Sequence, residues 1–285
     1  MRVFQTSAPA KINVYLRITG RREDGYHLLD SLMIPISLSD DITVQIEDGP
    51  PSISLTCDDP TLPADDTNLA YRAAALLSRE ARIVSHIKIT LHKRIPAGAG
   101  LGGGSSDAAA VLKSMNTLLA LGLSEKQLCQ YGVQLGADVP FFIGCRPARV
   151  EGIGEILTPV PPLPHRWIVL IVPPFSVSTP WAYRRFDELQ PGAQSTTFLF
   201  NTNTSEWPAP AQLVNDLEQA VLPAYPPITK IKSTLMALGA EGTLMSGSGS
   251  SVFGLFREQT AATAATTALQ SQGRVFLTTP LLHAG

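Results

Sequence analysis

The feature that most constrains this fold is a glycine-dense segment, Gly98-Ala99-Gly100-Leu101-Gly102-Gly103-Gly104-Ser105-Ser106-Asp107. Alternating apolar residues over 87–91 predict a strand that stops before this segment, at Ile95-Pro96. Apolar residues at helical spacing over 111–119 predict a helix directly after it. Glycines let the backbone take positive φ and approach a ligand closely, and the free N–H groups at a helix start favour an anion. The sequence therefore predicts a phosphate-binding loop between a strand and a helix.

Two other kinds of glycine-rich phosphate loop fit this segment less well. A Walker A loop ends in Gly-Lys-Ser/Thr, whereas Gly104 is followed by Ser105 with no lysine. The spacing Gly98-x-Gly100-x-x-Gly103 does match a dinucleotide-binding fingerprint. Against that interpretation, Pro96 follows an amphipathic strand, and the acid at the required distance, Glu125, lies in a helix cap. A flexible loop without a ligand is the remaining alternative, and the direct entry into a helix argues against it.

Three polar residues outside the loop are candidates for chemistry. Alternation from Ala10 to Thr19 predicts a half-buried strand with Lys11 and Asn13 on the same face. Asp138 follows a predicted helix end among apolar residues, where a carboxylate can serve as a general base. Two of them also have an ordinary structural interpretation. Lys11 could be a solvated lysine on an edge strand, and Asp138 could be an aspartate in a cap or turn.

The composition is that of a globular protein without a broad charged surface. The chain has 285 residues, of which 44% are hydrophobic and 16% charged, and its formal charge is -2 at pH 7. Such a balance gives no positive field for binding nucleic acid or anionic lipid. The three cysteines and five histidines show no disulfide-scaffold or metal-ligand spacing. We expect a cytoplasmic protein that is neither exported nor embedded in a membrane.

A proline-rich connector suggests where the chain divides. Four of the seven residues from Thr158 to Pro164 are proline, which cannot extend a helix or a central strand. We place the boundary there, giving domains of residues 1–158 and 159–285. The other expected elements are helices over 69–82 and 124–136, a helix stop at Gly122, strands over 28–38, 167–172 and 274–277, a hairpin around 246–251 and a helix over 261–269.

Five motifs follow one another over nearly the whole chain. They are Pro9-Ala10-Lys11-Ile12-Asn13, Gly20-Arg21-Arg22-Glu23-Asp24-Gly25-Tyr26-His27, the glycine loop within residues 96–109, Gly136-Ala137-Asp138-Val139-Pro140-Phe141-Phe142 and Ser246-Gly247-Ser248-Gly249-Ser250-Ser251. With these motifs the chain resembles the 4-diphosphocytidyl-2-C-methyl-D-erythritol kinases of the galactokinase, homoserine kinase, mevalonate kinase and phosphomevalonate kinase (GHMP) superfamily. The loop alone is typical of the superfamily, and the other motifs narrow the resemblance to this family.

The resemblance implies an α+β fold of two domains. The N-terminal ATP-binding domain would be similar to the second domain of ribosomal protein S5, the C-terminal domain would be ferredoxin-like, and the active site would lie in a cleft between them. ATP would phosphorylate the 2-hydroxyl of 4-diphosphocytidyl-2-C-methyl-D-erythritol in the non-mevalonate route to isoprenoid precursors. The resemblance also implies ATP as cosubstrate, Mg2+ as cofactor and a small-molecule substrate as partner. We expect a monomer or a weak homodimer.

The same resemblance implies roles at the reacting end of the site. Asp138 would be the base and Lys11 the cation beside it. Asn68 and Lys93 match positions near the adenosine in relatives. ATP would be bound by a continuous stretch whose amides from Gly98 onward hold the phosphates: Pro96, Ala97, Gly98, Ala99, Gly100, Leu101, Gly102, Gly103, Gly104, Ser105 and Ser106. The residues that would bind the metal are not identified.

At the other end of the site, the resemblance implies residues that hold the substrate. Asn13 and His27 would contact it, and Tyr26 would stack on its cytosine together with a second aromatic ring. We assign that ring to Tyr183, although Trp181 is close in sequence.

Two alternatives remain open. The chain could be another GHMP kinase of homoserine or mevalonate type, which would bind no cytidine. It could also be a catalytically inactive nucleotide-binding regulator, which would bind ATP without transferring phosphate. Residues 190–210 show no family pattern.

Overall fold

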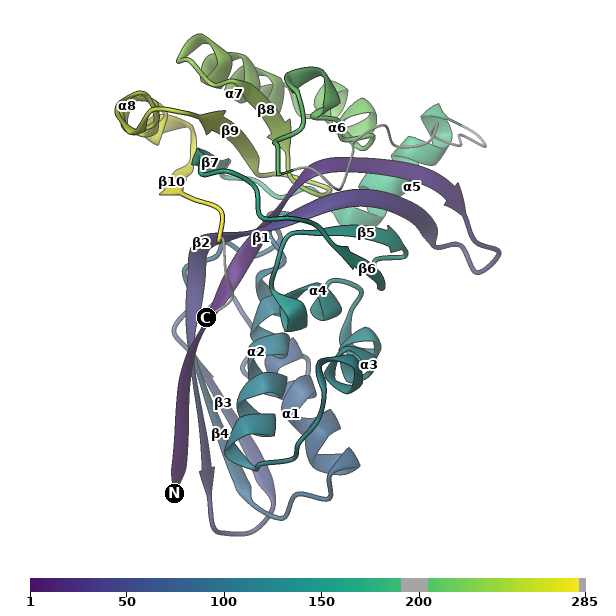
Figure 1. The fold of residues 1–285 in the computed structure, drawn as a ribbon, viewed down its shortest axis with the longest axis vertical. Helices are drawn as coiled ribbons and strands as arrows, with labels where there is room; N and C mark the ends of the chain where they lie inside the picture. The colour runs from purple at the N-terminus through teal and green to yellow at the C-terminus, as the bar shows by residue number, and fades with distance from the viewer. Residues whose placement is uncertain (191–204, 282–285) are drawn as a thin grey trace. The chain divides into compact units, whose positions relative to one another are not determined.

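The computed structural model describes residues 1–190 and 205–281 (Figure 1). The chain divides into two compact units. Unit 1 is Met1–Ala10, Leu38–Ala97 and Gly102–Cys145, and unit 2 is Lys11–Ser37, Gly98–Leu101 and Arg146–Gly285. Each unit is assembled from separate stretches of chain, so this division does not test a single cut after residue 158, and that boundary stays a prediction.

Two long strands contribute residues to both units. Strand β1 (Arg2–Arg21) pairs with β2 (His27–Glu47) across a short turn. The predicted half-burial of the first strand is wrong, because every residue from Ala10 to Tyr15 is buried. Lys11 and Asn13 share a face as predicted, but that face is covered by other parts of unit 2 instead of water. Both strands also extend well beyond the apolar runs that predicted them.

Unit 1 packs four helices with a short stretch of sheet. Residues 41–47 of β2 pair antiparallel with β4 (His86–His92), and β3 (Ser52–Cys57) pairs parallel with β4. The helices are α1 (Leu69–Glu80), α2 (Gly103–Leu118), α3 (Glu125–Leu135) and α4 (Val139–Gly144). Helix α2 packs on the other three, and α1 also lies against β3 and β4. The apolar residues that predicted β4 are buried as expected.

Capping residues explain where these helices begin. Asn68 accepts a hydrogen bond from the N–H of Ala70 at the start of α1, and Ser124 with Gln127 forms a capping box at the start of α3. Helix α2 begins after Gly102, whose φ is +73°. It ends at Leu118, earlier than the stop predicted at Gly122. The short helix α4 was not predicted.

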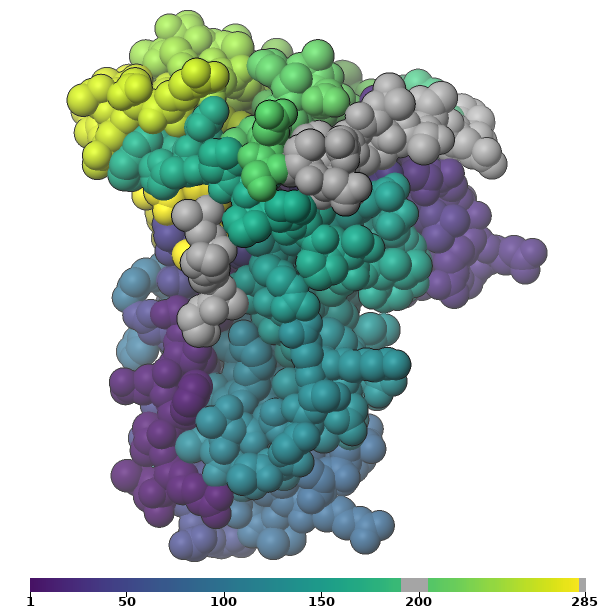
Figure 2. Space-filling model, in the orientation of Figure 1, coloured from purple at the N-terminus to yellow at the C-terminus, as the bar shows by residue number. Residues whose placement is uncertain are grey.

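Unit 2 has an antiparallel sheet in the order β10-β7-β9-β8. Its strands are β7 (Trp167–Val172), β8 (Gly242–Met245), β9 (Val252–Phe256) and β10 (Arg274–Thr278), and its helices are α5 (Thr179–Leu189), α6 (Glu218–Ala224), α7 (Pro226–Ala237) and α8 (Gln259–Ala268). Helix α8 lies against β7 and β10, and both C-terminal elements are yellow in Figure 2. The predicted strands, hairpin and C-terminal helix are confirmed, whereas α5, α6 and α7 were not predicted.

The rest of unit 2 joins β2 to two short strands. Residues 29–33 of β2 pair antiparallel with β5 (Ala148–Gly152), which pairs with the edge strand β6 (Ile156–Pro159). Pro159 falls at the end of this edge strand, where a missing N–H is tolerated. Leu16 and Ile18 of β1 join a core formed with β7, β9 and the helices. Short 3-10 turns occur at Pro210–Gln212 and Gln270–Gln272.

The mixture of sheets and helices agrees with the predicted α+β class. Within residues 1–190 and 205–281, no helix is both long enough and apolar enough to cross a lipid bilayer.

Candidate active site

Strand β1 holds a lysine in the interior of unit 2. Lys11 is 4% exposed, and its Nζ donates to Asn13 Oδ1 at 2.6 Å. Burying an ammonium is costly unless it is paired or hydrogen-bonded, so the amide oxygen of Asn13 offsets part of that cost. The prediction that these two residues share a strand face is confirmed, and the structure adds that they are in direct contact.

Asn13 is itself fixed from the other side. Its Nδ2 donates to Ser31 Oγ at 2.8 Å, and Ser31 Oγ donates to the carbonyl of Tyr15 at 2.6 Å. Its backbone N–H donates to Ser246 Oγ at 3.3 Å. Both ends of the amide are occupied, so the side chain cannot turn over without losing a bond. Asn13 thus orients Lys11, in addition to any contact with substrate.

The first glycines of the loop lie directly against the Ser246–Ser251 turn. Ser246 Oγ donates to the carbonyl of Gly100, and Ser251 Oγ donates to the carbonyl of Ala99 at 2.6 Å. Gly100 has φ +77°, and a Cβ there would stand 2.2 Å from the carbonyl oxygen of Ser246. A side chain is therefore excluded at Gly100 by both its conformation and its neighbour. The serine turn braces the glycine segment.

Asn215 anchors this turn and was missed by the sequence interpretation. Its Nδ2 donates to the carbonyls of Met245 and Gly247, both at 2.8 Å, and its Oδ1 accepts from the N–H of Leu217. The side chain is 3% exposed. A buried amide with all these bonds is a rigid support. Its anchoring role could not be found locally, because the two carbonyls that it binds lie about thirty residues further along the chain.

Aromatic and charged residues gather around His27 in unit 2. The rings of His27 and Tyr183 stack with centroids 4.7 Å apart, and His27 Nε2 lies 2.7 Å from an oxygen of Asp187 on α5. Trp181 instead packs edge-on against Tyr225. Of the two candidate rings, Tyr183 is the one that lies beside His27. Tyr26 is 62% exposed.

In unit 1, Asp138 occupies the residue before helix α4. Its side chain does not cap that helix, and Val139 to Ile143 after it are buried. This matches the predicted apolar surroundings. Residues 102–106 form the turn into α2, where Ser106 is buried. Asn68 caps α1 and donates to the carbonyl of Pro63. Its side chain therefore has a structural role, in addition to any role in nucleotide binding.

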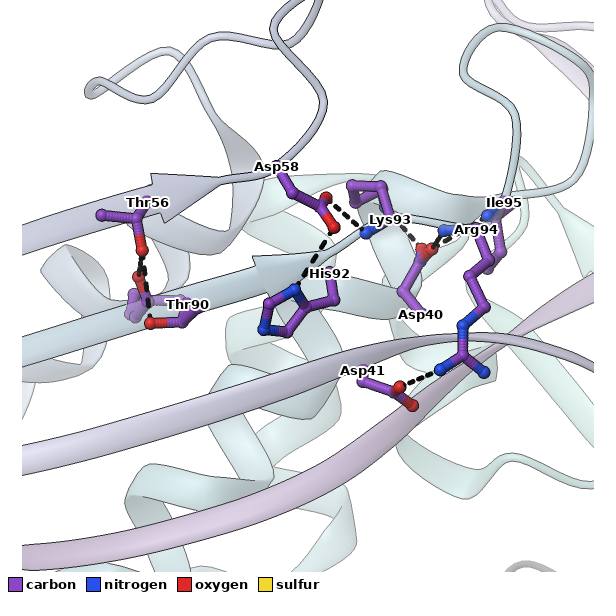
Figure 3. Close-up of polar contacts among 10 residues, drawn as sticks. Asp40, Asp41, Thr56, Asp58, Thr90, His92, Lys93, Arg94 and Ile95 are labelled. Atoms are coloured by element: carbon purple, nitrogen blue, oxygen red, sulfur yellow. Dashed lines mark hydrogen bonds and ion pairs between the residues drawn. The ribbon is translucent and has the colours of Figure 1, made fainter.

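The ammonium of Lys93 lies between two buried carboxylates. Its Nζ donates to Asp40 Oδ2 at 2.5 Å and to Asp107 Oδ2 at 2.6 Å, and the three side chains are at most 5% exposed. Asp40 Oδ1 also accepts from the N–H groups of Arg94 and Ile95 (Figure 3). We call Asp40, Lys93 and Asp107 the Lys93 cluster. Its three members come from β2, from the segment after β4 and from the first turns of α2. The sequence analysis therefore did not predict that they lie together.

Burial and charge perturb the pKa values in the Lys93 cluster. Burial, together with the second carboxylate at Asp40, raises the pKa of Asp107 to about 7, against the opposing attraction of Lys93. Burial acts to lower the pKa of Lys93, but Asp107 and Asp40 together raise it by more. One ammonium cannot fully compensate two buried carboxylates, and for this reason the pKa of Asp107 is raised.

We expect Asp107→Asn to flatten the dependence of stability on pH. Because the folded-state pKa of Asp107 is raised, its protonated form favours folding below the ordinary aspartate value, and this contribution is lost as pH rises towards 7. Each pH unit in that window changes the free energy of unfolding by up to about 1.4 kcal/mol. Urea unfolding of both proteins between pH 5 and 8 measures the difference. Curves that fall in parallel would contradict the assignment.

The described residues contain no group of three or more His, Cys, Asp or Glu side chains placed to hold a metal ion. This does not conflict with Mg2+ bound through a nucleotide, because Mg2+ in kinases takes most of its ligands from phosphates and water.

Comparison with known proteins assigns the chain to a family. Residues 68–145 match the model of the GHMP kinases N terminal domain, and residues 203–275 match that of the GHMP kinases C terminal. The 4-diphosphocytidyl-2-C-methyl-D-erythritol kinase of Syntrophotalea carbinolica is 46% identical over 276 residues, covering 96% of this chain and 98% of its own. The kinase of the same name from Citrifermentans bemidjiense is 44% identical over 262 residues, 92% of each chain.

The chain belongs to the 4-diphosphocytidyl-2-C-methyl-D-erythritol kinase family. A crystal structure of a 4-(cytidine 5'-diphospho)-2C-methyl-D-erythritol kinase is similar to it with a TM-score of 0.82 and 36% identity, covering 99% of this chain and 100% of that one. The predicted family and its two GHMP kinase domains are thereby confirmed. As a member of this kinase family the chain is an ATP-dependent transferase.

Proposed function

We propose that this chain transfers the γ-phosphoryl group of ATP to the 2-hydroxyl of 4-diphosphocytidyl-2-C-methyl-D-erythritol, within the non-mevalonate route to isoprenoid precursors. The observation that carries the proposal is the 44–46% identity, over nearly the whole length of both chains, to kinases named for that substrate. The buried Lys11–Asn13 pair and the braced glycine segment support it, because phosphoryl transfer depends mainly on positioning and on charge compensation.

In the proposed reaction Asp138 accepts the proton of the 2-hydroxyl. The hydroxyl oxygen forms a bond to the γ-phosphorus as the bond to the β-phosphate oxygen breaks, and ADP leaves. Lys11 stabilises the developing negative charge on the attacking oxygen. Backbone amides of residues 98–106 hold the phosphates, with Asn68 and Lys93 near the adenosine. Mg2+ would compensate phosphate charge; Ser106 Oγ is buried without a hydrogen-bond partner among the described residues, and a hydroxyl oxygen is of the hard type that Mg2+ prefers.

For the cytidyl group, we propose that Tyr26 and Tyr183 stack on the two faces of the cytosine while Asn13 and His27 contact the substrate. The exposure of Tyr26 and the position of Tyr183 beside His27 support these roles. We further propose a cytoplasmic enzyme that acts as a monomer or weak homodimer on a small molecule, with no nucleic-acid or membrane partner. The near-neutral charge of the chain is consistent with that proposal.

A coupled kinase assay tests the function directly. Purified protein with ATP and Mg2+ should release ADP when given 4-diphosphocytidyl-2-C-methyl-D-erythritol, and 31P NMR should show a new phosphate ester. Homoserine and mevalonate serve as controls. Transfer to either of them would indicate the corresponding GHMP kinase, and ATP binding without transfer to any acceptor would indicate a nucleotide-binding regulator.

We expect Tyr26→Ala to raise the KM for the cytidyl substrate and to leave the KM for ATP nearly unchanged. Stacking on a base contributes about 1 to 3 kcal/mol, which corresponds to roughly 5- to 150-fold in affinity. Tyr26→Phe keeps the ring and should behave like the wild type. Steady-state kinetics with each substrate varied in turn provide the measurement. An equal rise in both KM values would mean that Tyr26 has a packing role instead.

A further inference from the structure

Three consecutive backbone N–H groups after β4 donate hydrogen bonds to carboxylates. The N–H of Lys93 donates to Asp58 Oδ1 at 2.8 Å, and those of Arg94 and Ile95 donate to Asp40 Oδ1 at 2.6 and 2.9 Å (Figure 3). A segment that leaves a sheet loses its ladder partners, so its amides need other acceptors. Here the acceptors are charged, which makes the bonds shorter and stronger than those between neutral groups. The chain is therefore held at the point where it enters the glycine-rich loop.

The chain is held again where it leaves the loop. Asp107 lies in the first turns of α2 and bonds to the ammonium of Lys93 at 2.6 Å. Gly103 packs on the same segment, because a Cβ there would lie 3.1 Å from Ile95 Cγ2 and 3.6 Å from Lys93 Nζ. Lys93 thus connects the residues before the loop, through Asp40, to the residues after it, through Asp107.

The Lys93 cluster is a costly way to stabilise a fold. It buries one cation with two carboxylates, and Asp107 Oδ1 is buried without a hydrogen-bond partner among the described residues. Apolar side chains of similar volume commonly stabilise a core as well as a buried ion pair does, or better. What charged hydrogen bonds add is direction, since they fix the atoms that they join.

We propose that the Lys93 cluster is a positioning device that closes the base of the glycine-rich loop and so orders its backbone amides for ATP. The inference rests on the proposed function, in which that loop holds the phosphates. In this proposal the ammonium of Lys93 acts through its bonds to Asp40 and Asp107. Only the backbone of Lys93 would then contact the adenosine. Asp40, Lys93 and Asp107 are positioning residues for nucleotide binding and do not touch the reacting atoms.

The test removes the connection at Asp107. Asp107→Leu cuts the link to α2 and leaves Lys93 paired one to one with Asp40, whereas Asp107→Asn keeps an acceptor oxygen. Asp41→Asn is the matched control, because it removes the exposed Arg94–Asp41 ion pair beside the cluster without affecting the link to α2. Hydrogen exchange of nucleotide-free protein and calorimetric titration with a non-hydrolysable ATP analogue are measured on all four proteins.

For Asp107→Leu we expect amides of residues 98–106 to exchange at least about tenfold faster, with peptides from α1 and α3 unchanged. The ATP analogue should bind at least about tenfold more weakly, while the KM for the cytidyl substrate stays the same. Asp107→Asn and Asp41→Asn should match the wild type near neutral pH. If Asp107→Leu does not fold, Asp107→Ala makes the same cut and is interpreted in the same way.

Two results would overturn the inference. One is unchanged exchange and unchanged affinity in the leucine variant. The other is faster exchange throughout unit 1 together with a lower melting temperature, which would make the cluster merely structural. A wild-type protein that does not bind the ATP analogue, but whose loop is loosened by Asp107→Leu, would refute the proposed function and the role in nucleotide binding, and would leave only the ordering of the loop.

Discussion

Asp138→Asn should lower kcat by about 10²- to 10⁴-fold, the range typical of losing a general base. Asparagine keeps the shape of the side chain but cannot take the proton of the attacking hydroxyl. Asp138 precedes α4 without capping it, so the substitution removes no helix cap and should leave the melting temperature close to that of the wild type. The KM values should change little, because the proposed role is in the chemical step. A variant with nearly normal kcat would show that transfer relies on positioning alone.

The same proposal makes Lys11 and Asp138 a catalytic unit, which a double-mutant cycle can test. Lys11→Met keeps an apolar stem in the interior while removing the ammonium, and it should also lower kcat. If the two residues act together, the double variant should lose much less than the product of the single losses. Losses that multiply fully would show that the two side chains act independently. Melting temperatures of all four proteins exclude unfolding as the cause.

Gly100→Ala should be strongly disruptive although it adds only one methyl group. The residue has φ +77°, and the new Cβ would meet the carbonyl oxygen of Ser246 at 2.2 Å. A left-handed conformation costs a non-glycine residue about 1–2 kcal/mol, and overpacking typically adds about 1–3 kcal/mol. Because the clash is with backbone, the glycine segment and the serine turn must separate. We expect lower stability and a loss of ATP affinity.

Gly122→Ala is the matched control for that substitution. Gly122 also has positive φ, at +67°, but nothing lies within 4 Å of a Cβ built there. It should show only the conformational cost, with ATP affinity unchanged. Urea unfolding and titration with the ATP analogue separate the two effects. Equal behaviour of the alanine variants would mean that the contact between Gly100 and Ser246 has no role beyond allowing positive φ.

The parts of the structure that could be predicted are those with local signals. The helices expected over 69–82 and 124–136 begin within one residue of α1 and α3, because the caps Asn68 and Ser124 and the amides that they satisfy lie within a few residues. The shared face of Lys11 and Asn13, on which the structure shows their contact, followed from the two-residue period of a strand. The family motifs indicated the chemistry only through a resemblance, and the assignment of single residues to roles stays a prediction.

What could not be predicted depended on residues far apart in the chain. The Lys11–Asn13 pair lies in the interior because Asn13 bonds to Ser31 and Ser246, which no spacing rule connects to β1. The Lys93 cluster joins residues 53 and 14 positions away from Lys93. The domain boundary after Thr158 was inferred from the proline content of the connector. The compact units instead each combine three stretches that are separate in the sequence. Residues 191–204 of the stretch without a family pattern lie outside the described residues.

Unit 2 combines an early segment of the chain with late ones, which has a consequence for folding during synthesis. Ile18 of β1 donates its N–H to Asp216, 198 residues later, and Leu16 donates to Val214 nearby. A ribosome adds about 5–20 residues per second, so this early strand waits on the order of ten to forty seconds for its partners. All residues of unit 1 precede Arg146, so they are synthesised before most of unit 2. During that interval Ile12, Val14, Leu16 and Ile18 form an apolar stretch without its final cover, and this is where a nascent chain would most need a chaperone.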